Sequence, residues 1–454
     1  MAEPAGTGGS GISAGRKVAV AGVIAGVTGL AVQLIAANSL TPEANARFLI
    51  FWSLLFGVYG VLTGLQTEST RAVRATLTSA SGGAPGASGA ASRAPASPTT
   101  PGRHPRVLPV GLGIGMLTSV LLAATSPWWS SGILADAADG AGVPYSVDPG
   151  AVATTVAAVA AVCLGALAFA GHATTAGALS GLDRWGPYSA LIGGESTLRL
   201  VITAGVALAG ASLVGYELAA ALATFFWAAL YVAHPASRAA WSARADRPLR
   251  PYLLTLAQAM GATTATAVLV TGYAVMIDLT TPARIVDASA PFLLAVSLTR
   301  ATLLMPVNAF QGMAIAHVVT RRGAARRFTA RAGAAVVAVG AAGALAAWAV
   351  GPWLLNLLRP GYHVTGPVLA GLMVGATSLA VLVIASSVCL ALGRHGAYVL
   401  GWVLALLGAV ALLLTPWSLE TRVIASLTLG PLLGTAFHAA VVLRETGAAT
   451  DTRG

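Results

Sequence analysis

Hydrophobic residues in this chain gather in long blocks that short polar or proline-containing connections separate. Most blocks reach about twenty residues, the length with which an α-helix crosses a hydrocarbon core of about 30 Å. Hydropathy predicts about twelve such spans. The break between the fifth and sixth rests on Gly210 and Gly215 alone. The predicted spans are 17–40, 48–70, 107–128, 151–179, 188–212, 213–233, 252–279, 288–319, 328–357, 364–392, 397–416 and 422–443.

Composition agrees with this pattern. Apolar residues make up 56% of the chain and charged residues only 9%, whereas ordinary soluble domains carry about 25% charged residues. A soluble fold with so little charge would leave apolar surface facing water. The sequence therefore predicts an all-α integral membrane protein with about twelve transmembrane helices.

The placement of the basic residues predicts the orientation. If the N-terminus is cytoplasmic, most arginines fall in inner connections, and only Arg47, Arg284, Arg359 and Arg422 fall in outer ones. This bias is the positive-inside rule, and it predicts a multi-pass protein with both termini in the cytoplasm. The net charge of +11 is spread over many loops, so nucleic acid is not an expected partner. Clustered arginines in these loops are instead suited to membrane lipid headgroups.

The spans divide into two lobes of six helices each. Residues 17–234 form the expected first lobe, which contains a disordered cytoplasmic loop at 79–105 rich in Ala, Gly, Ser, Pro and Thr. A basic cytoplasmic linker at 235–251 leads to the second lobe at 252–443. Residues 1–16 and 444–454 are expected to be disordered cytoplasmic tails.

The two halves open in a similar way. The turn at 40–44 reads LTPEA and the turn at 279–283 reads LTTPA, and the helices that follow carry GLQ at 64–66 and AFQ at 309–311. With six spans per half, the lobes run in the same direction around an axis along the membrane normal, an architecture known in transporters. A central cavity between the lobes is expected. This counterpart in the second half also favours a retained first helix over a cleaved secretory signal.

Three ionisable residues lie deep within predicted spans, where a charge is costly. Glu195 and Arg199 stand four residues apart, so they share one helix face and can pair. Arg199 lies roughly 16 Å into its span and Arg300 about 18 Å into the eighth. We interpret both arginines as cavity residues that bind an anionic group through the guanidinium fork.

Other roles for these three residues remain open. Glu195 and Arg199 would then form a structural pair that locks helices, and backbone carbonyls would neutralise Arg300. Glu195 is also a candidate to carry a coupling proton or sodium ion. No other cofactor and no metal are expected, because the sequence shows no metal-ligand spacing.

Further polar residues are candidates for the cavity or a gate. Gln66, Glu68 and Arg71 lie at the inner end of the second span and are candidates for a cytoplasmic gate, although side chains at span ends also reach water by snorkelling. Cavity-lining polar residues, which would otherwise bond neighbouring helices, are Gln258, Asn308 and Gln311. Pro291 and Pro306 are expected to loosen the eighth helix.

Enzymatic and redox functions find little support in the sequence. There is no H-E-x-x-H motif and no Walker lysine loop, since Lys17 is the only lysine. Cys163 and Cys389 both lie in apolar blocks, so a disulfide framework is not expected. We therefore do not expect an enzyme.

The first hairpin and the two-by-six architecture carry a family resemblance. The hairpin runs from LTP at 40–42 through Phe51-Trp52 to GLQTESTR at 64–71. It resembles the multidrug/oligosaccharidyl-lipid/polysaccharide (MOP) exporter superfamily, and specifically its polysaccharide biosynthesis (Wzx-like) flippase branch. The resemblance implies a bacterial inner-membrane flippase with a basic central cavity, which moves a polyprenyl-(pyro)phosphate-linked oligosaccharide by alternating access. Enzymes of glycan assembly are then expected partners.

The sequence differs from the family pattern in two ways, and two alternative functions remain open. Only two arginines reach mid-depth, and the 79–105 loop is long. One rival is an ion-coupled multidrug or metabolite antiporter of the same superfamily, with Glu195 as its coupling residue. The other is a non-transporting scaffold for glycan assembly, in which an Arg300→Ala change would be silent.

Overall fold

The computed structural model describes residues 8–81, 104–134, 149–210, 212–320 and 325–451. These residues are almost entirely helical, and they contain no strand beyond an isolated bridge between Arg106 and Arg244. The longest helices are α1 (Gly8–Ser39), α2 (Pro42–Ser81), α3 (Val107–Ile133), α4 (Pro149–Gly181), α5 (Trp185–Leu208), α9 (Leu249–Val270), α12 (Ala290–Thr320), α13 (Ala325–Leu358), α14 (Gly366–Ala391), α15 (His395–Leu413) and α16 (Leu419–Asp451). The shorter ones are α6 (Leu213–Leu222), η2 (Ala223–Phe225), α7 (Phe226–Ala233), η3 (Pro235–Arg238), α8 (Ala239–Ser242), α10 (Tyr273–Leu279) and α11 (Ala283–Asp287).

The helices confirm the predicted fold class. Within the described residues, eleven helical segments are long and apolar enough to cross a membrane, with α6, η2 and α7 acting together as one of them. In addition, α12 contains a shorter apolar stretch at Ala290–Leu304, at the position of the predicted eighth span. The predicted break between the fifth and sixth spans is also present, because α5 ends at Leu208 and Gly210 turns the chain with a φ of 64°.

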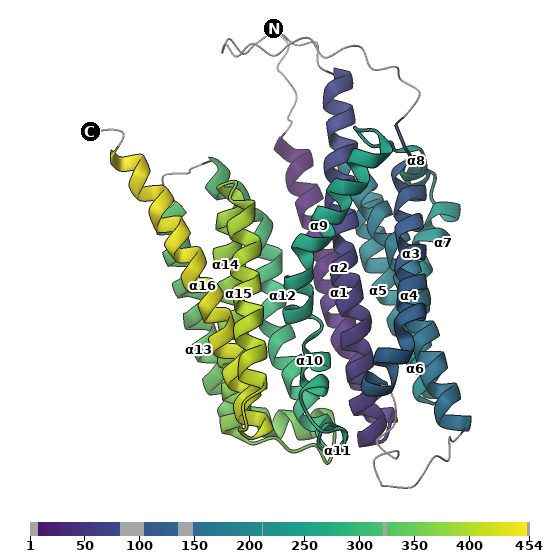
Figure 1. The fold of residues 1–454 in the computed structure, drawn as a ribbon, viewed down its shortest axis with the longest axis vertical. Coiled ribbons are helices and arrows are strands. Elements are labelled where there is room, and N and C mark those ends of the chain that lie inside the picture. The colour runs from purple at the N-terminus through teal and green to yellow at the C-terminus, as the bar shows by residue number, and fades with distance from the viewer. Residues whose placement is uncertain (1–7, 82–103, 135–148, 211, 321–324, 452–454) are drawn as a thin grey trace.

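Figure 1 shows two helical bundles side by side, with both chain termini at the same end of the molecule. In the first bundle, α2 and α3 pack on α4, and α1 packs on α5. In the second, α14 is the central helix and contacts α12, α13 and α16. Helix α14 is accordingly buried along most of its length.

The two bundles meet along α2 and α9. Gly60 and Gly64 of α2 form a G-x-x-x-G pair, the small-residue spacing that lets membrane helices approach closely. A Cβ atom at Gly64 would lie 2.5 Å from the backbone nitrogen of Met260, and one at Gly60 would lie 2.6 Å from the Cβ of Ala267. The α2–α9 seam therefore depends on these two glycines.

The seventh span differs from its prediction. It was expected as one helix over 252–279, but α9 ends at Val270 and α10 begins at Tyr273. The hydroxyl of Ser53 on α2 inserts at this break, where it donates to the Thr271 carbonyl at 2.6 Å and accepts from the Ala274 amide at 3.1 Å. A cross-helix hydroxyl thus replaces helical hydrogen bonds.

The eighth helix was expected to be loosened by its prolines, yet α12 is assigned as one helix over Ala290–Thr320. Pro291 lies in its first turn, where the missing amide hydrogen has no intrahelical partner to lose. The side chain of Pro306 lies outside the described residues. The seventh predicted span, and not the eighth, is therefore the one that is interrupted.

Helices also continue into segments for which disorder is expected. Residues 8–16 belong to α1, residues 79–81 to α2 and residues 444–451 to α16. The remainder of the expected tails and of the 79–105 loop lies outside the described residues, apart from 104 and 105.

A second repeat between the halves appears in the turns that follow α4 and α14. The sequences are LDRWGPY at 182–188 and LGRHGAY at 392–398. Asp183 and Gly393 both have positive φ, 57° and 79°. The next residues, Arg184 and Arg394, have nearly identical backbone angles (φ −87°, ψ 63° and φ −89°, ψ 61°). The two lobes thus share one turn geometry at equivalent positions.

Candidate functional site

Glu195 and Arg199 form a buried ion pair on α5, as their spacing predicts. The Arg199 guanidinium also donates to the carbonyl of Ala220 at 3.1 Å and to the hydroxyl of Thr224 at 3.2 Å. The Thr224 hydroxyl donates in turn to Glu195 at 3.3 Å. Because Arg199 is only 5% exposed, this pair is closed off from solvent and tied to the sixth span.

Aromatic rings from α2 and α4 surround the pair. The Arg199 Cζ atom lies 5.0 Å from the ring centre of Phe56 and 5.9 Å from that of Trp52, within cation–π range. Tyr59 stacks on Phe169 at 4.3 Å between ring centres. The hydroxyls of Tyr59 and Thr224 lie 3.1 Å apart and share a hydrogen bond.

His172 completes this group. It is buried, it stacks on Phe169 at 5.4 Å between ring centres, and its Nδ1 atom has no hydrogen-bond partner among the described residues. We call Glu195, Arg199, Thr224, Tyr59 and His172 the first-lobe polar centre. Sequence reasoning missed the last three, although a histidine inside an apolar block was a visible signal.

Arg300 lies on α12 in the second lobe and has different partners. It is 7% exposed and donates to the backbone carbonyls of Leu269, at 2.9 Å, and Val270. Its Cζ atom lies 5.1 Å from the ring centre of Tyr273. These carbonyls end α9 at the break before α10, so Arg300 supplies the donors and the positive charge that a helix C-terminus favours.

The described contacts do not bring Arg199 and Arg300 to a common partner. Arg199 bonds α5, α6 and η2, and Arg300 bonds the end of α9. The anion-binding role of both arginines therefore stays a prediction. For Arg300, neutralisation by backbone carbonyls is the arrangement observed.

The three gate candidates lie at the end of α2 nearer the termini. Arg71 forms hydrogen-bonded ion pairs with Glu68, at 2.6 Å, and with Asp246 of the linker, at 2.9 Å. Burial raises the pKa of Asp246, but the hydrogen bonds and charge of Arg71 outweigh this and hold it below its ordinary value. Gln66 instead donates to the Tyr188 hydroxyl at 3.3 Å. Arg71 thus fastens α2 to the inter-lobe linker, while Glu68 pairs with it from the preceding turn of the same helix.

For the other cavity candidates, no hydrogen-bond partner is described. Gln258 is exposed on α9. Asn308 and Gln311 belong to α12, but their side chains lie outside the described residues. Their expected roles in the cavity stay predictions.

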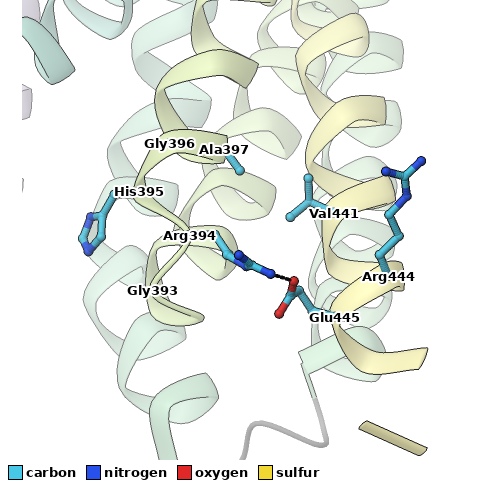
Figure 2. Close-up of a pocket in the computed structure, with 8 residues that line it drawn as sticks. All are labelled: Gly393, Arg394, His395, Gly396, Ala397, Val441, Arg444 and Glu445. Atoms are coloured by element: carbon cyan, nitrogen blue, oxygen red, sulfur yellow. Dashed lines mark hydrogen bonds and ion pairs between the residues drawn. The ribbon is translucent and has the colours of Figure 1, made fainter. Parts of the chain in front are cut away.

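Two surface pockets lie away from these residues. The larger, of about 480 Å³, lies between the α14–α15 turn and α16, where Arg394 reaches across to Glu445 while His395 and Arg444 point outward (Figure 2). The other, of about 320 Å³, lies between α1 and α5 beside Arg16, Lys17 and Ser189. No predicted site residue lines either pocket.

The part of the chain that is described shows neither a metal-binding cluster nor a disulfide. No cluster of three or more His, Cys, Asp or Glu residues with a metal-binding arrangement occurs there. Cys163 and Cys389 are both free, one on α4 and the other on α14.

Comparison with known proteins gives full-length relatives but no described family, because no family model matches the chain. Uncharacterized protein Rv3630 of Mycobacterium tuberculosis is 33% identical, over 98% of this chain and 96% of its own length. Uncharacterized protein Rv1510 of the same species is 32% identical over 90% and 87%. Uncharacterized protein Mb3654 of Mycobacterium bovis is 33% identical over 97% and 94%.

Solved structures with the same fold are transporters. An inward-facing multidrug resistance MATE family transporter of the MOP superfamily superimposes with a TM-score of 0.62, at 14% identity over 95% of this chain and 96% of the other. The outward-facing form gives 0.63, at 14% identity over 97% and 96%. A MOP superfamily transporter from Pyrococcus furiosus, whose description mentions a binding pocket of reverse polarity, gives 0.61 at 14% identity over 94% and 95%.

Proposed function

The chain belongs to the same family as the mycobacterial proteins Rv3630 and Rv1510 and has the fold of MOP-superfamily transporters, and on this basis we propose that it is a cation-coupled secondary transporter. Its substrate is a small organic solute, exported by alternating access of the two lobes. The coupling cation is a proton, and Glu195 of the first-lobe polar centre carries it. The protein resides in a bacterial cytoplasmic membrane with both termini inside.

The observation that supports this proposal is the burial of Glu195 beside side chains that can both donate and accept hydrogen bonds. Its carboxylate accepts from Thr224, whose hydroxyl meets that of Tyr59, and His172 lies within electrostatic reach. Hydroxyl and imidazole groups both donate and accept hydrogen bonds. A buried ionisable side chain in a membrane span is by default a candidate functional site.

Protonation of Glu195 has a direct consequence for Arg199. The neutral carboxyl group no longer balances the guanidinium, and an uncompensated buried charge is strongly unfavourable. The lobe must then rearrange, or an anionic or electron-rich substrate group must take the place of the carboxylate. Proton binding and substrate binding therefore become linked through one residue pair.

Transport in proteoliposomes tests this proposal. With an imposed pH gradient, uptake of the anionic aromatic dye carboxyfluorescein should exceed that of empty liposomes, and its entry should drive proton movement in the opposite direction. Glu195→Gln should abolish this coupling, Glu195→Asp should restore part of it, and Glu420→Gln, an exposed acid on α16, should leave it unchanged. Coupled transport that survives Glu195→Gln would contradict the assignment of Glu195.

A flippase for lipid-linked glycans is the second candidate. The hairpin at 40–71 supports it, and so does the presence of a buried arginine at mid-depth in each lobe. In this case, the headgroup phosphate would replace the present partners of Arg199, and glycan-assembly enzymes would be partners. Depletion of the protein should then accumulate one polyprenyl-linked oligosaccharide in the inner leaflet, relieved by wild type and not by Arg199→Ala. If neither the amount nor the leaflet of any such lipid changed, the flippase candidate would be rejected in favour of the cation-coupled transporter.

A further inference from the structure

The two lobes also touch at the end of the molecule opposite the chain termini, near α11 in Figure 1. The side-chain amide of Asn38 donates to the carbonyl of Leu358 at 2.9 Å. The amide of Asn45 donates to the hydroxyl of Tyr362 at 3.1 Å. These polar contacts join the α1–α2 turn of the first lobe to the α13–α14 connection of the second.

An ion pair lies at the centre of this region. Arg47 of α2 meets Asp287 of α11 with an Nε–Oδ1 distance of 2.8 Å and an Nη2–Oδ2 distance of 2.9 Å. The two side chains are 7% and 13% exposed. Only the Nη2–Oδ2 contact is a hydrogen bond, because the Oδ1 atom of Asp287 is buried without a hydrogen-bond partner among the described residues. We call the three polar pairs (Asn38–Leu358, Asn45–Tyr362 and Arg47–Asp287) the outer contact.

Asp278, at the end of α10, is a second carboxylate within electrostatic reach of the pair. It is 6% exposed, and its Oδ2 atom has no hydrogen-bond partner among the described residues. It lies beyond the membrane-spanning segment Leu249–Val270. Burial, opposed by Arg47 and reinforced by Asp287, raises the pKa of Asp278 to about 7.

The surrounding charges do not supply Asp278 with another partner. Arg422 of α16 donates through its two Nη atoms to the carbonyls of Thr280 and Leu413 and to the hydroxyl of Thr281, and its Nε atom makes no hydrogen bond to Asp278. Arg284, Glu43 and Glu420 are exposed to solvent. The other helices that pack on α10 are α3, α9 and α15; α3 has no charged residue, and Arg250 and His395 lie at the opposite ends of α9 and α15.

We propose that Asp278 is a proton-binding site that controls the outer contact between the lobes. With the proton bound, Arg47 and Asp287 balance each other and the contact stays closed. Without it, the ionised Asp278 adds a second negative charge beside the balanced Arg47–Asp287 pair, and this buried charge has no hydrogen-bonded or ion-pair partner among the described residues. Opening hydrates Asp278 and relieves that charge.

Linkage gives the direction and size of the effect. In the closed form the pKa of Asp278 is about 7, and in an open, hydrated form it approaches the ordinary aspartate value of about 3.9. The closed form therefore binds the proton more tightly, and it is favoured at low pH and lost as pH rises through about 7. Full ionisation would shift the closed-to-open ratio by on the order of 10³-fold.

This inference rests on the proposed transport function only in that a transporter must open this contact during its cycle. The site is distinct from the first-lobe polar centre, because it joins the lobes rather than lying within one. The variant Asp278→Asn imitates the protonated state. We therefore expect the outer contact to stay closed at every pH in this variant.

Spin-label distance measurements between Glu43→Cys and Ala288→Cys test the proposal, in full-length protein whose Cys163 and Cys389 are replaced by alanine. Both label sites are exposed, one in each lobe. In wild-type background the distance distribution should move from short to long as pH rises from 5 to 9. Asp278→Asn should keep the short distance throughout, and Glu420→Gln should behave as wild type.

A distribution that ignores pH in the wild-type background would overturn the proposal, and so would a pH-dependent shift that persists in Asp278→Asn. Asp278→Glu, which keeps a titratable group, should retain the transition and shows whether position 278 tolerates substitution. Because no substrate is present, failure here leaves the transport proposal intact. Loss of transport in Glu195→Gln does not affect this result.

Discussion

Arg199 and Arg300 are both buried arginines at mid-depth of their helices, and their surroundings separate their roles. Arg199 pairs with the carboxylate of Glu195, and in the proposed transport cycle protonation of that carboxylate changes the charge balance at Arg199. Arg300 faces backbone carbonyls, which do not titrate. Arg300, whose carbonyl partners do not titrate, is suited to stabilising the break between α9 and α10. Arg199, whose partner is a carboxylate, is suited to the proposed coupling of proton binding to transport.

Replacing Arg300 tests this distinction. Arg300→Met removes the donors to Leu269 and Val270, and each carbonyl left unsatisfied costs about 1–3 kcal/mol. We expect a lower unfolding midpoint in detergent by several degrees, with Arg300→Lys in between. If Arg300 instead binds substrate, Arg300→Met should keep the wild-type midpoint and lose only transport.

The helix elements show where this fold tolerates departure from a regular helix. The α9–α10 break is filled by Ser53 and capped by Arg300, so its backbone groups keep partners inside the bundle. The turns at 182–188 and 392–398 repeat one another in backbone angles, and Gly393 takes its positive φ without the strain that Asp183 must bear. The α2–α9 seam depends on close backbone approach at Gly60 and Gly64.

A larger residue at Gly64 should disturb this seam. A Cβ there would lie 2.5 Å from a backbone atom of α9, so Gly64→Leu must push the lobes apart at this level. Overpacking of this kind costs about 1–3 kcal/mol. The thermal unfolding midpoint in detergent should fall, and the rate of transport should be reduced.

Gly22→Ala on α1 is the matched control, because no atom lies within 4 Å of a Cβ at that position. It should match or slightly exceed wild-type stability, since alanine favours a helix more than glycine does. Equal stability of Gly64→Leu and Gly22→Ala would show that α2 and α9 do not pack as described.

At the scale of the whole molecule, contacts between the lobes occur at three levels. The α2–α9 seam runs through the middle, and the outer contact closes the end opposite the termini. Nearer the termini, Ser69 meets Tyr252 at 3.3 Å and Arg71 holds the linker through Asp246. Alternating access requires the first lobe to turn about the seam while one end closes and the other opens.

The predicted orientation has a direct measurement. Single cysteines at Arg184→Cys and Ala288→Cys, both exposed, should react differently with a membrane-impermeant maleimide in intact cells. Ala288→Cys should be labelled, and Arg184→Cys should be labelled only after the membrane is permeabilised. The reverse pattern would place the termini and the α4–α5 turn outside, and the outer contact would then face the cytoplasm.

The sequence by itself determined the class of protein and the number of spans, because bilayer thickness sets helix length whatever the packing. It also placed Glu195 and Arg199 on one helix face, since that depends only on the helical period. It could not determine what Arg300 contacts, that the seventh helix breaks, or that Tyr59, His172 and Thr224 join the polar centre. Those features depend on helix rotation and packing between distant segments. For the same reason, only the tertiary structure brought Arg47, Asp278 and Asp287 together across the two lobes.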